Sequence, residues 1–270
     1  MLLNVQEERT AIDGSWMDYV VMGSGNIPLV ILHGLGDGLK TVRGQSLQLA
    51  WYYRKFAKRY KIYVFSRKDK LKKDYTTEDM AKDQKVVLDK IGIKQFYLMG
   101  VSQGGMICQH IAIRYPEAVK KMVLVATISK PNKLLLNTIY RWSDMANNED
   151  YKSLMIDTCE SLYSAKRLRL YRPMYSIISK IGKPESFDRF LIQAKSCITH
   201  NAYNLLERIE CSTLIIAGEE DKVVGKHSSE EMARQIPNNK LVIYAGVGHA
   251  LYEEVKVFKQ DVLKFLENVS

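Results

Sequence analysis

The sequence predicts an α/β fold in which a mostly parallel sheet is flanked by helices and carries a helical insertion. The first observation is a set of short apolar runs bounded by turn residues, typical of buried parallel strands, at residues 28–33, 61–65, 96–100, 122–126, 213–217 and 241–245. The second is that helical patterns lie between these runs, which favours right-handed βαβ units. The third is a break in this alternation between about residues 129 and 208, where the pattern is helical.

Two helices are predicted from their end signals. Thr76 and Asp79 have the spacing of a helix N-cap with an acid three residues on, and Gly92 is well placed to end that helix. The next helix is expected to begin right after Ser102. It should stop before Pro116, because proline disfavours helical backbone in the residue that precedes it.

The two ends of the chain carry weaker signals. Apolar residues at helical spacing predict a third helix from about Tyr252, and residues 16–22 are predicted to form an antiparallel edge strand. Together with the break in the strand pattern, these elements divide the chain into a core and an insertion. The expected core is residues 1–130 and 209–270, and the insertion, residues 131–208, is expected to be a helical cap over one edge of the sheet.

The composition is that of an ordinary globular protein, with 46% hydrophobic and 26% charged residues in a chain of 270. No apolar run approaches the roughly 20 residues that a membrane-spanning helix needs. The N-terminal segment has neither the basic leader nor the apolar stretch of a signal peptide, so a cytoplasmic location is expected. The four cysteines lack metal-ligand spacing and are expected to be reduced and buried.

The net charge of +10 is concentrated in one stretch of the chain. Ten lysines and arginines lie between Arg54 and Lys73, with Asp69 as the one acid among them. Such a stretch binds nucleic acid, attracts an anionic substrate or forms a solvated face, and the solvated face is the default interpretation. Nothing nearby resembles a nucleic-acid-binding module, so nucleic-acid binding is not expected.

The strongest chemical motif is Gly100-Val-Ser102-Gln-Gly104, which fits the pattern G-x-S-x-G. It follows a predicted strand and opens a predicted helix, which is the context that a nucleophile elbow requires. The sharp turn strains the backbone of the serine, and the flanking glycines leave room for it. Free N–H groups at the start of the helix favour negative charge at the same place. Ser102 is the predicted nucleophile; the alternative is a glycine-rich turn with a spectator serine.

A second motif, His33-Gly-Leu-Gly-Asp37, directly follows the first parallel strand. Its glycines let the backbone bend and turn an N–H group towards the serine. The backbone N–H groups of Leu35 and Gln103 are predicted to form an oxyanion hole. The alternative is a simple glycine-rich connection, and His33 is interpreted as a structural residue hydrogen-bonded inside the loop.

An acid and a histidine follow the last two predicted strands. Asp221 and His249 each come just beyond a strand, so both are expected at the carboxyl edge of the sheet, where open α/β folds bind their ligands. His249 is the predicted base that takes the serine proton. Asp221 is predicted to hold the imidazole in the right tautomer, with Glu219 and Glu220 as adjacent alternatives.

These segments resemble the α/β-hydrolase superfamily, and within it the capped esterase, enol-lactonase and C–C hydrolase branch. The resemblance is carried by HGLGDG at 33–38, GVSQGG at 100–105, CSTLIIAGEEDKVV at 211–224 and GVGHALYEE at 246–254. It covers the core, whereas the cap resembles family caps only in its place and helical character. The resemblance implies an α/β-hydrolase fold with Ser102 as nucleophile, Asp221 as acid, His249 as base, and Leu35 and Gln103 as oxyanion donors.

The chain departs from this family after the strand that ends near Phe65. Members usually have an acidic, glycine-rich loop there, whereas this chain has the basic segment 66–73. That loop lies near the site in relatives. Arg67, Lys68 and Lys70 are therefore candidates to favour an anionic or polar substrate.

The expected activity is that of a carboxylesterase-like serine hydrolase, which cleaves an ester or related acyl compound through an acyl-enzyme. Alternatives on the same residues are C–C bond hydrolysis, lactone opening, acyl transfer and cofactor-free peroxidase-like chemistry. A non-catalytic ligand-binding module is the rival class. The expected partner is a small ester or acyl molecule, with no cofactor and no metal ion. Aromatic and methionine residues of the insertion that are candidates to line its pocket are Tyr140, Trp142, Met145, Tyr163, Tyr171, Met174 and Tyr175. Neither the substrate nor the oligomeric state is indicated.

Overall fold

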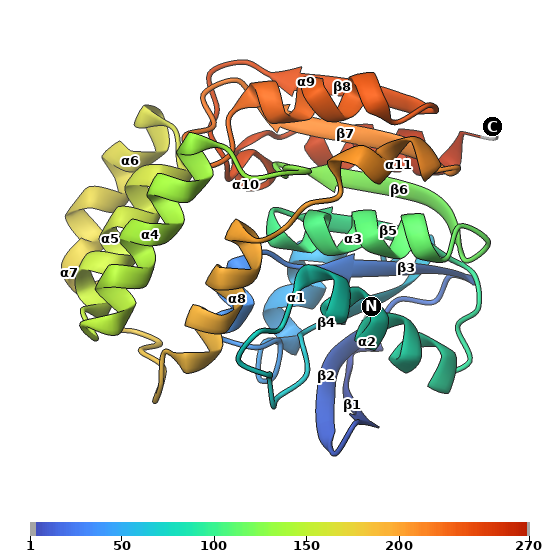
Figure 1. Cartoon of the computed structure of the whole chain (residues 1–270), viewed down its shortest axis with the longest axis horizontal. Coiled ribbons are helices and arrows are strands. Elements are labelled where there is room, and N and C mark those ends of the chain that lie inside the picture. Colours follow the sequence, from blue (N-terminus) through green and yellow to red (C-terminus); the bar gives the residue numbers. More distant parts are fainter. Residues whose placement is uncertain (1–3, 269–270) are drawn as a thin grey trace.

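The computed structural model describes residues 4–268 and is built on one eight-stranded sheet (Figure 1). The strands lie in the order β1-β2-β4-β3-β5-β6-β7-β8. Their bounds are β1 Gln6–Ile12, β2 Ser15–Met22, β3 Ile27–Leu32, β4 Tyr60–Phe65, β5 Phe96–Val101, β6 Val119–Val125, β7 Ser212–Gly218 and β8 Asn239–Tyr244. The pairs β1–β2 and β2–β4 are antiparallel and the other five are parallel, so the predicted mostly parallel sheet is confirmed.

Helices cover both faces of this sheet. Those outside the insertion are η1 Leu35–Gly38, α1 Ser46–Tyr53, α2 Thr77–Lys90, α3 Gln103–Arg114, α9 Lys226–Gln235, α10 Leu251–Glu254 and α11 Phe258–Glu267. Apolar residues of α2, α3 and α9 form one core cluster, and those of α1 and α11 form another. Successive strand residues alternate between the two clusters, as Leu98 and Met99 do, because neighbouring side chains of a strand point to opposite faces.

The helix ends that the sequence predicts are confirmed. Asp79 N–H donates to Thr76 Oγ1 and Thr76 N–H donates to Asp79 Oδ2, each at 3.1 Å, which is a capping box. Gly92, just beyond this helix, has a φ of 80°, a conformation that glycine adopts without strain. Helix α3 ends at Arg114, two residues before Pro116.

Two expectations about the ends of the chain are wrong. Residues 16–22 lie in β2, but β2 is not an edge strand, because β1 pairs along its outer side. Strand β1 is mostly exposed, so it has no apolar alternation from which to predict it. The helix expected from about Tyr252 is two helices, since Val255 adopts extended backbone with φ −85° and ψ 112°. That break lets Phe258 begin α11 with its side chain buried against the sheet.

The chain between β6 and β7 forms a helical insertion, Lys133–Arg208. Its elements are α4 Lys133–Asn147, α5 Tyr151–Leu162, α6 Ala165–Tyr171, η2 Arg172–Met174, α7 Tyr175–Ile178, α8 Asp188–Ile198 and η3 Tyr203–Arg208. Figure 1 shows α4 to α7 gathered beyond one end of the sheet, with α8 returning towards the core. A third apolar cluster joins this insertion to the core, because it contains Leu35 and Met106 as well as residues of α4 and α8.

All four cysteines are buried free thiols, as the sequence predicts. In residues 4–268 we find no helix with the length and apolar character needed to cross a bilayer.

His200 is a buried titratable group where the insertion returns to the core. It is 1% exposed, and its Nδ1 shares a 3.0 Å hydrogen bond with Thr77 Oγ1. Burial and the nearby imidazole of His110 lower the pKa of His200 from 6.5 to about 3. The folded protein therefore holds this imidazole neutral.

This burial predicts a pH dependence of stability. The unfolded chain binds a proton at His200 near pH 6.5, while the folded chain binds it only near pH 3. The free energy of unfolding should therefore fall as the pH falls below 6.5, by up to about 1.4 kcal/mol per pH unit from this group. Urea unfolding over this range measures the slope. His200→Gln should flatten it, with the exposed His227→Gln as control; an unchanged slope in His200→Gln contradicts the prediction.

Candidate active site

Ser102 lies at the turn between β5 and α3 with a strained backbone. Its φ of 53° and ψ of −120° fall where residues other than glycine are rare. The turn is tight because a Cβ on Gly104 would lie 2.0 Å from the carbonyl oxygen of Leu32. Hydrogen bonds hold it in place: Ser102 N–H donates to Val125 O at 2.9 Å, and Thr127 Oγ1 donates to Ser102 O at 2.7 Å.

Two backbone N–H groups next to this turn are free. Leu35 is the first residue of η1 and Gln103 the first of α3, so neither N–H has an acceptor within its own helix. Among the described residues no other acceptor is found for either group. The loop before η1 approaches the serine closely, since a Cβ on Gly34 would lie 3.2 Å from Ser102 Cβ. The arrangement offers two donors to an oxygen held beside the serine.

His249 and Asp221 form a buried pair. Their Nδ1 and Oδ2 atoms are 2.8 Å apart, and the two side chains are 4% and 1% exposed. Asp221 Oδ1 accepts the N–H groups of Val223 and Val224 at 2.8 and 3.0 Å. Burial would raise the pKa of Asp221, but the charge of His249 and these hydrogen bonds outweigh it and lower the pKa. An ionised carboxylate only accepts, so Nδ1 carries a hydrogen and Nε2 is the ring nitrogen left to act as a base.

The neighbouring acids do not share this position. Glu219 and Glu220 are exposed, and Glu219 lies 3.6 Å from Lys226. Of the three candidate acids, Asp221 is the one that reaches the imidazole.

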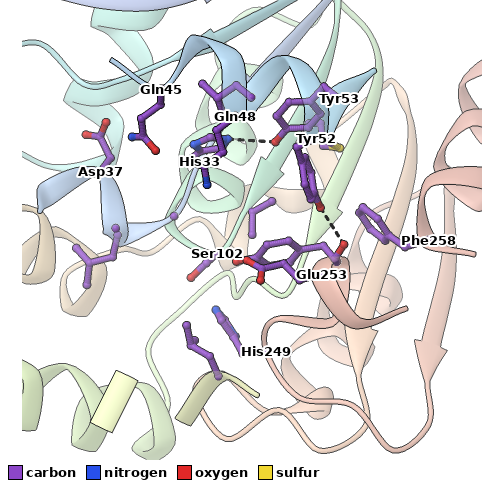
Figure 2. Close-up of a pocket in the computed structure, with 18 of the residues that line it drawn as sticks. His33, Asp37, Gln45, Gln48, Tyr52, Tyr53, Ser102, His249, Glu253 and Phe258 are labelled. Carbon is purple, nitrogen blue, oxygen red and sulfur yellow. Dashed lines mark hydrogen bonds between the residues drawn. The ribbon is translucent and has the colours of Figure 1, made fainter. Parts of the chain in front are cut away.

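Ser102 and His249 line one pocket of about 880 Å³ (Figure 2). Pockets of about 300–1,000 Å³ hold small-molecule ligands, so this one accepts a substrate of modest size. Its walls come from the η1 loop, from α1, from the α10–α11 region and from the insertion. Of the aromatic and methionine residues named as candidates to line a pocket, only Trp142 does so; Tyr140 and Met174, for example, are exposed.

The hypothesis that the basic segment 66–73 favours an anionic or polar substrate gains no support from the pocket wall. No residue of this segment lines the pocket within the described part of the chain. Arg67 and Lys68 are instead 3% and 4% exposed. A buried cation needs partners, and Lys68 Nζ finds one in Asp83 at 2.8 Å.

A buried network that the sequence did not reveal ties the η1 loop to α8 of the insertion. Arg189 Nη2 lies 2.7 Å from Asp37 Oδ2, and Gln193 Nε2 donates to the same oxygen at 3.0 Å. Arg189 also donates to the carbonyl oxygens of Arg67 at 2.9 Å and Lys68 at 2.6 Å. Burial would raise the pKa of Asp37, but the charges of Arg189 and Arg67 outweigh it and lower the pKa.

The side chain of Gln103 belongs to the same network. Its Nε2 donates to Gln193 O at 2.8 Å, and its Oε1 accepts from Arg67 Nη2 at 2.8 Å. Arg67 Nη2 also donates to His33 O at 2.6 Å. Both free N–H groups therefore sit on segments whose positions depend on α8. No sequence signal could have found this, because Arg189 is separated from Asp37 by 152 residues.

His33 is a structural residue, as predicted, but its hydrogen-bond partner lies on α1 and not inside its own loop. Its Nε2 shares a 3.1 Å hydrogen bond with Tyr53 Oη on α1. Burial and the charge of Arg67 lower the pKa of His33 to about 4, so the ring is neutral at neutral pH.

Residues 27–255 match the family described as the alpha/beta hydrolase fold, and the chain belongs to this family. The predicted fold class is thereby confirmed, and the chain is an enzyme of the hydrolase class.

Individual relatives are distant. The chain is similar to a 2-hydroxy-6-oxononadienedioate/2-hydroxy-6-oxononatrienedioate hydrolase of a Pseudomonas species, with 29% identity over 198 residues, covering 69% of this chain and 68% of that protein. Among solved structures it resembles an alpha/beta hydrolase enzyme from a Medee basin deep-sea metagenome library, with 23% identity and a TM-score of 0.84 over 97% of this chain and 98% of that one. It also resembles the enol-lactonase of Burkholderia xenovorans LB400, with 18% identity and a TM-score of 0.80 over 97% and 100% of the two chains.

The Asp37–Arg189 pair predicts a large stability effect. Arg189→Met leaves a buried carboxylate without its cation and should lower the free energy of unfolding in urea by about 3 kcal/mol. Adding Asp37→Asn should restore part of that loss. On the same helix, Lys195→Met breaks the exposed pair with Asp74 and should leave the free energy of unfolding nearly unchanged, because solvent screens that pair. Equal losses in Arg189→Met and Lys195→Met would count against the network.

Proposed function

We propose that the protein hydrolyses a carboxylic ester, or a related acyl compound, through an acyl-enzyme on Ser102. The observation that carries this is that the buried His249–Asp221 pair shares one pocket with a serine held in a strained turn. A serine hydroxyl is a weak nucleophile by itself, and the Nε2 atom of the imidazole supplies the base it needs.

The reaction proceeds in two halves. Ser102 Oγ attacks the carbonyl carbon as His249 Nε2 takes the hydroxyl proton, and the oxyanion accepts the N–H groups of Leu35 and Gln103. The intermediate collapses, the alcohol leaves with the proton from His249, and Ser102 is acylated. Water then attacks the acyl group, giving its proton to His249, and the acid is released as Ser102 regains its hydrogen. Asp221 stays ionised throughout and stabilises the imidazolium.

The helical insertion acts in this proposal as a cap, residues 131–208, over a core of residues 1–130 and 209–270. In support, insertion residues contribute to the pocket wall, namely Trp142, Thr158, Leu162, Arg167 and Phe190. We also propose a cytoplasmic location, since four free thiols fit a reducing compartment.

C–C bond hydrolysis on the same residues is the second candidate. It is favoured by the relative whose name describes a 2-hydroxy-6-oxononadienedioate hydrolase. A panel that contains simple esters and a 2-hydroxy-6-oxo-dienedioate separates the two reactions, because an esterase turns over the esters alone.

Replacing the candidate nucleophile should abolish turnover. Ser102→Ala is expected to lower kcat for a p-nitrophenyl ester by at least about a thousandfold, because the acyl-enzyme can no longer form. The parent should also be labelled by a fluorophosphonate probe at Ser102. The exposed Ser176→Ala is the matched control and should keep both activities. Retention of most turnover in Ser102→Ala would falsify the assignment.

The acid is tested by an isosteric change. Asp221→Asn keeps the shape of the side chain but favours the wrong imidazole tautomer, and it is expected to lower kcat by about 10⁴. The adjacent, exposed Glu220→Gln removes a charge of the same sign and should leave kcat within about twofold of the parent. Steady-state kinetics on the same ester measure both, and comparable losses would exclude Asp221 as the acid.

A further inference from the structure

The pocket that holds Ser102 is lined by an excess of positive charge. Six cationic side chains contribute to its wall, namely Lys40, Arg54, Lys55, Arg167, Lys256 and Lys259. Within residues 4–268 no salt bridge joins any of the six to an acid. The acids that line the same pocket are Asp37, whose charge is paired with Arg189, and Glu253, which accepts a 2.8 Å hydrogen bond from Tyr163. Arg167 interacts with the charge of Glu253, so the other five are the cations available to a ligand.

Three of these cations, Arg54, Lys55 and Lys259, lie at the end of α1 and line the same pocket as the candidate catalytic histidine. Lys259 Nζ donates to Tyr52 O at 2.7 Å and lies 3.6 Å from the centre of the Tyr52 ring. The hydroxyl of that ring donates to the carbonyl oxygen of Tyr252 at 2.8 Å, and Tyr252 lies three residues after His249 in the chain. One tyrosine side chain thus spans from the His249 loop to the Lys259 ammonium group, and Arg54 and Lys55 follow Tyr52 in the chain.

Holding these like charges together is unfavourable without an anion. Burial, followed by the charges of Arg54 and Lys55, lowers the pKa of Lys259 to about 8. Helix capping explains part of the arrangement, because Arg54 and Lys259 donate to the last carbonyl oxygens of α1. Capping leaves Lys55 without a role. Crowded cations beside a ligand pocket are typical of a site that binds an anion.

Apolar residues also line this pocket. Leu49, Val101 and Phe258 line it together with the aromatic ring of Tyr52. Such a wall takes methylene groups, with a carbonyl at the serine and a charge at the lysine. Of the ten cations in the basic stretch, Arg54 and Lys55 are the ones that reach the pocket.

We propose that the preferred substrates are acyl compounds with a carboxylate at the far end of the acyl chain, such as half-esters of dicarboxylic acids. Lys259, with Arg54 and Lys55, binds that carboxylate while Ser102 attacks the ester carbonyl at the other end. The ester bond breaks, the alcohol leaves with the proton from His249, and water releases the free dicarboxylate. This inference rests on the proposed function of Ser102.

The kinetic test compares each charged ester with a neutral partner. Mono-p-nitrophenyl esters of dicarboxylic acids of increasing length are measured against the same compounds with the far carboxylate methylated, at low ionic strength. The parent should favour the charged ester by about tenfold in kcat/KM at its best chain length. In Lys259→Met that ratio should fall towards one, and in Lys259→Glu it should fall below one. Lys72→Met, in the basic segment outside the pocket, should keep the ratio of the parent.

A binding measurement separates this inference from the proposed reaction. Calorimetry on Ser102→Ala compares a dicarboxylic acid monomethyl ester with its dimethyl ester, and the monoester should bind about tenfold more tightly. Ester turnover with no preference for charge in either assay overturns the inference and leaves the proposed function standing. A charge preference in binding without turnover or fluorophosphonate labelling of the parent overturns the proposed function alone. A ratio unchanged in both Lys259 variants also overturns the inference.

Discussion

The site depends on one close contact, between the start of α3 and the end of β3 at Gly104. Any side chain there would collide with the carbonyl oxygen of Leu32, so glycine alone permits the approach. That approach forces the turn in which Ser102 adopts its strained backbone, and it brings the first N–H of α3 next to the loop that begins η1. A β-sheet of parallel strands with buried faces supplies the rigidity that such strain requires, because a flexible frame would relax it.

The buried ion pair between Asp37 and Arg189 then holds the insertion against the core. The carboxylate of Asp37 is buried, and leaving it unpaired would cost several kcal/mol, so Arg189 of α8 has one well-defined position. Since Arg67 and Gln103 share the network, the part of the insertion nearest the serine is coupled to the backbone donors beside it. Helices α5 and α6, by contrast, contribute only Thr158, Leu162 and Arg167 to the pocket wall and, among the described residues, have no part in this network.

The cations of the basic stretch fall into two groups, one buried in the core and one at the pocket wall. Arg67 and Lys68 are buried and hydrogen-bonded or ion-paired in the core, while Arg54 and Lys55 lie at the pocket wall. One continuous basic stretch of sequence therefore serves two physical roles. Solved structures that share only 18–23% identity with this chain have the same fold. Residues of the pocket wall can therefore differ while the sheet and the serine turn are kept.

Local patterns were sufficient to predict the parallel strands, the Thr76 capping box and the candidates Ser102, Asp221 and His249, because each depends on residues that are close in sequence. Strand β1 escaped prediction since pairing with β2, not apolar alternation, makes it a strand. The contact of His249 with Asp221, the burial of Arg67 and the bond from Arg189 to Asp37 were decided only by tertiary structure. Each depends on contacts between residues that are far apart in the chain. Burial determines how strongly a charged side chain affects stability, and a side chain is buried only once the chain has folded.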